Sequence, residues 1–251
     1  TNGVRSLSAF YRDLHVRPGG YLVSTFDALV ALNADGAIDG GFTADLAGLA
    51  SIAALGVDDQ GRIVAGGFGD GTTFRLLRLL SDGATDPAFG VGGTLDVPVP
   101  DFGGDDALIE GIQLDADGGG IALTETSLGT LLEQAPRLLR FRSNGTIDPG
   151  FGGGGLASVL EAPEVGPSRG LLRVSGDRIV TAAGTANGIS LDERFLARFN
   201  PDGSPDPTFG DQGRVLLQQF PRDLLYEPAA GRVYVVAEQG GGGILVQRFW
   251  L

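Results

Sequence analysis

Apolar residues along this chain fall into short runs of four to eight residues, and many of these runs alternate apolar with polar positions. Alternation with a period of two is typical of a strand that buries one face. Runs of this kind lie at residues 74–80, 137–141, 195–199, 233–236 and 244–249. Long amphipathic helical windows are missing. The Ala- and Leu-rich stretch at residues 45–55 has helical propensity, but its phase in the repeat described next predicts a strand.

Two phrases recur along the chain at intervals of tens of residues. The first is an Asx-Gly turn with a linker of the type Asp-Pro-x-Phe-Gly, at residues 33–42, 81–90, 143–152 and 201–210. Its turn glycines are Gly36, Gly83, Gly145 and Gly203, spaced 47, 62 and 58 residues apart. The second phrase is an apolar run after a turn, at residues 59–65, 117–123, 176–181 and 230–235, with a fainter copy at 17–23. Asx-Gly between apolar runs favours a tight turn, because Gly accepts a positive φ. The chain therefore contains five copies of one unit, the first shortened.

Each unit is predicted to hold four short strands. In the third copy these are an inner strand at residues 93–99, a second at 108–114, a third at 121–126 and an outer strand at 136–142. Repeats of about 40–60 residues with four antiparallel strands are typical of β-propeller blades, which bury both faces only by packing on their neighbours. We expect a single all-β domain, a five-bladed β-propeller of four-stranded antiparallel blades with a shortened first blade. Its blades would span roughly residues 1–40, 41–90, 91–150, 151–208 and 209–251.

The linker phrases at residues 82–90, 144–152 and 202–210 resemble the delta-60 repeat, as do residues 101–106 and the run that ends at Gly67. The resemblance covers nearly the whole chain. It implies a β-propeller from a bacterial protein, often secreted or on the cell surface, in a family without an assigned activity, and it carries over no catalytic residue. The chain departs from the family pattern because an inner strand before Leu7 is missing and because the first linker lacks the Pro and the trailing Gly. We expect the ring to close by side-chain packing between the first and last blades, with loss of upstream sequence as the alternative.

Charge and missing residue types exclude several kinds of protein. The 31 acidic and 18 basic residues, the latter all Arg, give a net charge of −13, which argues against nucleic acid as a partner. The absence of Cys excludes disulfides, thiolate nucleophiles and cysteine–zinc sites. No apolar run approaches the length of about 18 residues that a membrane helix needs, so we expect no membrane insertion. The start at Thr1 instead of Met predicts a processed or truncated product.

An Arg recurs five residues before the turn glycine. The copies are Arg78, Arg140 and Arg198, Arg248 matches them, and Ala31 breaks the set. One interpretation is a ring of anion sites, and the other is a fork that pairs with the repeat's own Asp and bridges neighbouring blades. Outer strands lie far from a propeller axis, which favours the fork. It predicts that at least one of these guanidinium groups lies within ion-pair range of Asp86, Asp148 or Asp206.

The linker Phe and a pair of Asx residues also recur. The Phe residues at positions 42, 89, 151 and 209 are predicted to be plugs between blades, each stabilising the fold by about 2–3 kcal/mol, and not a stacking platform. The Asx pairs lie at positions 35 and 39, 82 and 86, 144 and 148, and 202 and 206. Their oxygens could hold a divalent cation, but a calcium loop needs more oxygen ligands and a distal Glu, so we expect Asx turns.

Residues that are not repeated are better pointers to function, because the repeated ones serve the fold. The candidate metal ligands are Asp105, Asp106 and Glu110, and calcium is the cofactor that they would bind. The candidate binding residues are His15, Arg169, Asp192 and Glu193. Non-repeated loops at residues 128–135, 161–168 and 187–193 are expected on a rim, where such loops carry binding. No catalytic residue is assigned, since His15 is the sole imidazole and no Gly-x-Ser-x-Gly elbow exists.

These features predict a binding or interaction module that is secreted, periplasmic or on the cell surface. Its partner would be a protein or a glycan, and a homo-oligomer or a cell-surface assembly is a further expectation. The alternative is a propeller enzyme, a hydrolase or lyase with a carboxylate or metal site at the mouth of the central channel. A third interpretation is an assembly scaffold that packs its outer strands, or Phe249 and Trp250, against another chain. An enzyme needs convergent acidic or His side chains, a binding module needs an aromatic or charged groove, and a scaffold needs a large apolar patch.

Overall fold

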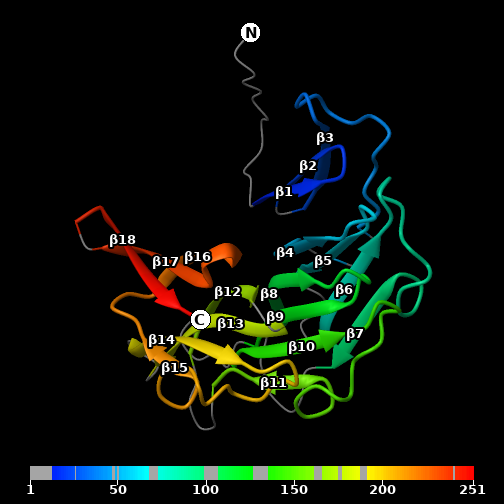
Figure 1. Ribbon diagram of the computed structural model, residues 1–251. Coiled ribbons are helices and arrows are strands. Elements are labelled where there is room, and N and C mark those ends of the chain that lie inside the picture. The colour runs from blue at the N-terminus through cyan, green and yellow to red at the C-terminus, as the bar shows by residue number, and fades with distance from the viewer. Residues whose placement is uncertain are drawn as a thin grey trace. The chain divides into compact units, whose positions relative to one another are not determined.

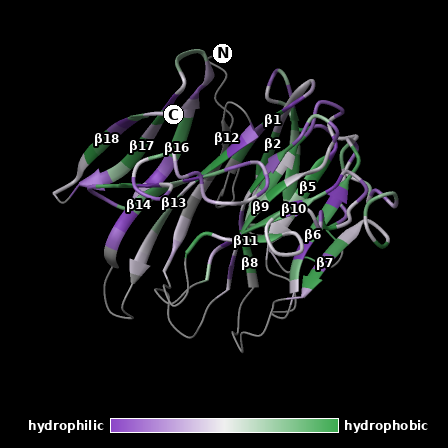
Figure 2. Ribbon diagram, turned by 60° about the horizontal axis from the view of Figure 1, so that its bottom comes forward, coloured by the Kyte–Doolittle hydropathy of each residue, from purple (hydrophilic) through white to green (hydrophobic). Residues whose placement is uncertain are grey.

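The computed structural model describes residues 13–25, 27–46, 49, 51–67, 73–98, 107–126, 135–160, 166–174, 177–186, 191–239 and 241–251. These residues form five antiparallel sheets of three or four strands each (Figure 1). Apolar residues concentrate in the strands, and many of the loops are hydrophilic (Figure 2). No helix in the described part of the chain has the length and apolar character needed to cross a membrane. The all-β prediction is confirmed.

The strands follow the order of the sequence from sheet to sheet. The first sheet contains β1 (Asp13–Arg17), β2 (Gly20–Ser24) and β3 (Leu29–Asn33). The second contains β4 (Ala54–Val57), β5 (Ile63–Gly67), β6 (Thr73–Leu79) and β7 (Thr94–Pro98). The third contains β8 (Ala107–Leu114), β9 (Gly120–Thr126), β10 (Arg137–Phe141) and β11 (Leu156–Ser158). The fourth contains β12 (Ser168–Val174), β13 (Arg178–Ala186), β14 (Leu191–Phe199) and β15 (Arg214–Leu216). The fifth contains β16 (Pro221–Glu227), β17 (Arg232–Gln239) and β18 (Gly243–Trp250), with a 3₁₀ helix at Pro228–Ala230 between β16 and β17.

The strand that follows each linker completes the preceding sheet. β7 pairs with β6, β11 with β10 and β15 with β14. The prediction that residues 93–99 begin the next blade as its inner strand is therefore wrong, and sheets two to four each extend past the predicted boundaries at 90, 150 and 208. A main-chain hydrogen bond explains this pairing. The N–H groups of Arg78, Arg140 and Arg198 each donate to the carbonyl of a glycine fifteen residues later, at 2.9 Å, which brings the chain back beside the strand that contains the Arg.

The first sheet has three strands among the described residues, and it contains no strand after the linker there. The predicted absence of an inner strand before Leu7 falls on residues 1–12, which lie outside the described residues. The fifth sheet also has three strands, which was not predicted. The strand predicted at residues 45–55 is also wrong for most of its length. β4 begins at Ala54, because the preceding segment donates its main-chain N–H groups at Thr43 and Asp45 to the next repeat's turn carbonyls instead of pairing as a strand.

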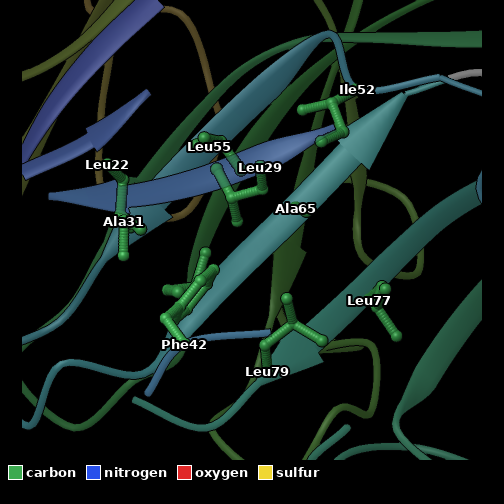
Figure 3. Packing of buried hydrophobic residues seen from close by; sticks show 10 residues of the cluster. Leu22, Leu29, Ala31, Phe42, Ile52, Leu55, Ala65, Leu77 and Leu79 are labelled. Atoms are coloured by element: carbon green, nitrogen blue, oxygen red, sulfur yellow. The ribbon is translucent and has the colours of Figure 1, made fainter. Parts of the chain in front are cut away.

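The chain divides into two compact units, and each has its own core. The first unit contains residues 1–101, 106–121 and 141–146, and the second contains residues 102–105, 122–140 and 147–251. The core of the first unit includes Leu22 and Ala31 of the first sheet, Phe42 of the linker and Leu79 of the second sheet, and in the view of Figure 3 Phe42 lies between Ala31 and Leu79. The core of the second unit joins the fourth and fifth sheets through Val180, Ala182, Leu196, Phe209, Leu217, Leu224, Val233 and Val235.

The linker Phe residues lie buried between sheets, which confirms their prediction as plugs. Phe89 is fully buried and packs edge to face on Phe141 of the following repeat, with ring centroids 6.1 Å apart. The turn glycines make room for these rings. At Gly203 φ is +84°, and an added Cβ would lie 2.8 Å from Cζ of Phe151. Both the turn and the ring therefore require glycine there.

Candidate functional site

The recurrent Arg and Asp residues form ion pairs in three successive repeats. The Nε to Oδ2 distance is 2.8 Å for Arg78 and Asp86, 3.6 Å for Arg140 and Asp148, and 2.9 Å for Arg198 and Asp206. The predicted structural fork is confirmed. Both members of the first and third pairs are buried, so these contacts are part of the core and not an anion site open to ligands.

The same fork also reaches the neighbouring repeat. Arg78 donates from Nη1 to the carbonyl oxygen of Ser143, at the start of the next turn. In the first repeat, where Ala31 stands at the Arg position, Arg17 takes over. It pairs with Asp39 and donates to the carbonyl of Ser81 at 3.0 Å. The repeated charges therefore tie one repeat to the next.

The repeated carboxylates have little capacity left for a cation. Oδ1 of Asp206 accepts the N–H of Thr208 at 3.0 Å and its hydroxyl at 2.6 Å, while Oδ2 accepts from Arg198 and from Arg178. Burial by itself would raise the pKa of Asp206. The two hydrogen bonds from Thr208, the charge of Arg198 and the hydrogen bond from Arg178 outweigh it and lower the pKa to about 2. The turn residues form Asx turns, in which Oδ1 of Asp35, Asp82, Asn144 and Asp202 accepts the N–H two residues later.

A groove of about 570 Å³ opens in the second unit over the outer strands of the fourth sheet. Alternate residues of β14 point into it, and the register sets Leu216 of β15 opposite Phe195 and Arg214 opposite Ala197. The lining residues are Ser158, Val159, Glu193, Phe195, Ala197, Arg198, Phe199, Pro205, Asp211, Gln212, Gly213, Arg214 and Leu216. The end of the third sheet's β11 therefore supplies one wall and the fourth sheet the other.

The floor of the groove is apolar and buried. Phe195, Ala197 and Phe199 are at most 2% exposed. The guanidinium of Arg214 lies over the ring of Phe195, with Cζ 4.4 Å from the centroid, within the usual range of a cation–π contact. Leu216 is different, because it is 67% exposed at the rim. A ligand that covers Leu216 would therefore bury apolar area.

Some charged side chains of the groove have an internal partner, and others have none among the described residues. Arg198 is held by Asp206 and by a hydrogen bond to Oγ1 of Thr208 at 3.0 Å. The carboxylates of Glu193 and Asp211 are exposed and have no hydrogen-bond or ion-pair partner among the residues that the structure describes. The groove therefore offers two free negative charges beside an apolar floor, which suits a cationic group attached to an apolar one.

Of the candidate residues predicted from the sequence, Glu193 lines this groove. His15 lies half-buried on β1 and Glu110 half-buried on β8. Arg169 and Asp192 lie on β12 and β14, and their side chains are outside the description, as are Asp105 and Asp106 altogether. Residues 127–134, 161–165 and 187–190, which make up most of the non-repeated loops, are outside it too. Among the described residues, no three or more His, Cys, Asp or Glu side chains are grouped so that they could hold a metal ion, and the calcium site stays a prediction.

Sequence reasoning missed most of the groove, although a signal was present. After the linker Gly, the second and third repeats continue with the uncharged residues 91–94 and 153–156, whereas the fourth continues as Asp211-Gln-Gly-Arg214. Asp211 and Arg214 are therefore charged residues at positions that the fold fills with uncharged ones. Residues that break the repeat are pointers to function. A search for them within the strands and linkers, as well as in the loops, identifies Asp211 and Arg214.

Comparisons with known proteins agree with this architecture. The model of a family described as a domain of unknown function (DUF5122) β-propeller matches residues 61–89, 133–151 and 178–209. No curated protein sequence matches the chain. The solved structure of the Dos1 propeller is similar with a TM-score of 0.54 and 12% identity, over 91% of this chain and 53% of that chain. The chain thus spans about half the length of that relative.

Two further solved structures have lower scores. Hsv2p of Kluyveromyces lactis has a TM-score of 0.46 and 10% identity, over 97% of this chain and 73% of that one. The Nup133 β-propeller domain of Vanderwaltozyma polyspora has a TM-score of 0.46 and 9% identity, over 95% and 71%. The family match and the Dos1 propeller, together with the five sheets, establish the all-β, β-propeller fold.

Proposed function

We propose that this chain is a binding module that recognises a basic, partly apolar segment of a protein partner in the groove over β14 and β15. The observation that carries the proposal is the pair of unpartnered carboxylates, Glu193 and Asp211, beside a buried aromatic floor. β-Propellers commonly act as interaction modules, and this use of the fold fits the groove. We further propose five blades, one for each sheet, of the delta-60 type, in a secreted, periplasmic or cell-surface protein.

Charge supports a basic partner over an acidic one. The chain has a net charge of −13, so its field attracts cations and repels anions at long range. Within the groove both guanidinium groups are already engaged, Arg198 by Asp206 and Arg214 on Phe195. A Lys or Arg side chain of the partner would pair with Glu193 or Asp211 without displacing an internal contact. Such exposed pairs favour association and orientation, and they weaken as salt rises.

The apolar part of the groove supports a polypeptide over an isolated ion. A volume of about 570 Å³ lies within the range of about 300–1,000 Å³ typical of organic ligand sites and is far larger than a single ion needs. A partner residue that covers Leu216, which is exposed at the rim, would supply the buried apolar area that a charge pair alone lacks. The segment expected is therefore one in which Lys or Arg neighbours Leu, Phe or Tyr.

The test uses an array of short peptides that combine Lys or Arg with Leu, Phe or Tyr, next to neutral peptides of the same apolar content and to immobilised glycans. The protein should bind the basic peptides, and Glu193→Gln and Asp211→Asn should each weaken binding about threefold to tenfold. Asp59→Asn is the matched control, because Asp59 is exposed and lies outside the groove while the change in net charge is the same. Equal losses in all three variants, or binding to glycans alone, would contradict the proposal.

A further inference from the structure

The turn that precedes the fourth strand is closed in the same way in sheets two, three and four. Its first N–H donates to the carbonyl three residues later at 2.7–2.8 Å. The three bonds run from Val91 to Thr94, from Gly153 to Leu156 and from Asp211 to Arg214. In sheets two and three the two central residues are both glycine, and their φ angles lie between +61° and +102°. A two-residue turn with positive φ at both centres is of type I′, and it favours glycine because a side chain there strains the main chain.

The fourth sheet keeps this turn but has a glutamine in it. Gln212 stands at the position of Gly92 and Gly154, and its φ is +53°. In this conformation the Cβ of an L residue crowds the neighbouring carbonyl, and Asn and Asp, not Gln, are the side chains that tolerate it. A Cβ built at Gly92 or Gly154 would meet no atom beyond its chain neighbours within 4 Å, so the strain at this position comes from the main chain alone. Glycine would therefore be the less strained residue at position 212.

The Gln212 side chain makes no internal contact that offsets the strain. It is exposed, and its amide has no hydrogen-bond partner in the described part of the chain. It lines the groove together with Asp211 and Glu193. Residues held in strained main-chain conformations cluster at ligand sites, so the strain at Gln212 indicates a role in the groove.

The outer edge of β15 offers main-chain groups to the same groove. The hydrogen bonds from Arg198 to Gly213 and from Leu217 to Arg194 fix which residues of this strand pair with β14. Leu216 falls on the alternate phase, so its N–H and C=O face away from β14, and β15 is the last strand of its sheet. Leu216 lines the groove, so an extended polypeptide placed there would meet both its main chain and the amide of Gln212.

We propose that Gln212 determines specificity in the groove by hydrogen-bonding the main chain of the bound segment through its side-chain amide. The inference rests on the proposed function and names what the segment must present, an extended stretch beside its Lys or Arg. A Gln amide carries one acceptor oxygen and two N–H donors, which match the N–H and C=O of a peptide group. The carboxylates of Glu193 and Asp211 only accept hydrogen bonds, so they do not supply the donated one. Because Gln212 is uncharged, its contact should not weaken as salt rises.

The test measures peptide affinity and thermal stability of the same variant. Gln212→Gly should weaken binding of the basic peptide that binds most tightly in the array about threefold to tenfold, equally at low and high salt. It should also raise the Tm by about 2–4 °C, because glycine relieves the strain. Replacing a residue that has only a structural role would lower the Tm, so the two opposite changes identify a binding role.

Ester substitution in the peptide identifies the group that Gln212 contacts. The same peptide is remade with each main-chain amide replaced in turn by an ester, which lacks the N–H. One of these esters should weaken binding to the unaltered protein about threefold to tenfold and have little further effect on binding to Gln212→Gly.

The matched control is Gly92→Gln, which places the same side chain in the equivalent turn of the second sheet, outside the groove lining. It should lower the Tm by about 2–4 °C and leave the peptide affinity unchanged. Equal peptide affinity of Gln212→Gly and the unaltered protein would overturn the inference and leave the proposed function standing, as would ester losses that are the same in both proteins. No binding of any basic peptide would overturn both.

Discussion

The fourth and fifth sheets are built from the same repeat, and they differ in what covers their third strand. In the fourth sheet, Leu196 and Phe195 are fully buried under β15 and the neighbouring sheets. In the fifth sheet, Val246 and Ile244 are 57% and 75% exposed on β18. Both strands have similar alternating sequences. Side chains of the third strand are therefore buried by the linker, by the strand that follows it and by the neighbouring sheet. The sequence of the third strand does not by itself decide their burial.

The largest effect is expected from removing the Arg of the buried pair. Arg198→Gln removes the buried one of the two guanidinium groups that pair with Asp206, leaves only the more exposed Arg178, and should lower the free energy of unfolding by about 3 kcal/mol. Arg248→Gln, at the matching position of the fifth sheet, should change it by less than about 0.5 kcal/mol. Urea denaturation followed by circular dichroism measures both. Equal losses would show that Arg248 has an internal partner.

The next effect concerns the apolar neighbour of that Arg. Leu196→Ala should cost about 2–5 kcal/mol, because it leaves a cavity in the core between the fourth and fifth sheets. Val246→Ala removes an exposed side chain and should cost less than about 0.5 kcal/mol. The same denaturation experiment compares them. A loss above about 1 kcal/mol for Val246→Ala would mean that the face of β18 is covered in solution.

The free energy of unfolding at low pH should depend on Asp206, which belongs to the linker of the fourth sheet. The pKa of Asp206 is lowered to about 2 from an ordinary value of 3.8, so the unfolded chain binds this proton more readily than the folded one. The stabilisation is complete above pH 3.8 and is lost as the pH falls through about 2, a contribution of about 2 kcal/mol. Asp206→Asn should remove that part of the acid dependence, measured as the free energy of unfolding at several pH values. An unchanged pH profile would contradict the contacts of Asp206.

The smallest effect is expected at the exposed ion pair of the fifth sheet. Arg222 and Glu238 are 67% and 70% exposed and lie 2.9 Å apart. Solvent and salt screen such a pair, so Arg222→Ala should change the free energy of unfolding by less than about 1 kcal/mol. Thermal unfolding at low and high salt is a sufficient measurement, and a larger loss would show that this face is buried.

Part of the fold could be predicted from short motifs in the sequence. The alternation of residues 195–199 gave a strand, and the fixed spacing of Arg198 and Asp206 gave their pairing, because both depend on neighbours within a few residues. The sheet to which the strand at 94–98 belongs was not readable. Its alternation fits either the preceding or the following sheet, and the choice depends on the hydrogen bond from Arg78 to Gly93 across the linker.

The groove was still less accessible to sequence reasoning. Glu193 was found because it borders a non-repeated loop, whereas Phe195 looks like any core residue of the repeat. The stacking of Arg214 on Phe195 depends on the register of β15 against β14, which the sequence does not fix.

Hydrogen exchange of single amides by NMR tests the central claim, that the third strand of a sheet is covered where the linker strand is present and open where it is absent. The amides of Leu196 and Arg198 face β15 and its linker, and they should exchange slowly, near the rate set by global unfolding. The amides of Val246 and Arg248 have the matching positions on the edge of β18 with which no strand in the described part of the chain pairs, and they should exchange close to the rate of an unstructured peptide. Equally strong protection at Val246 and Arg248 would contradict the account.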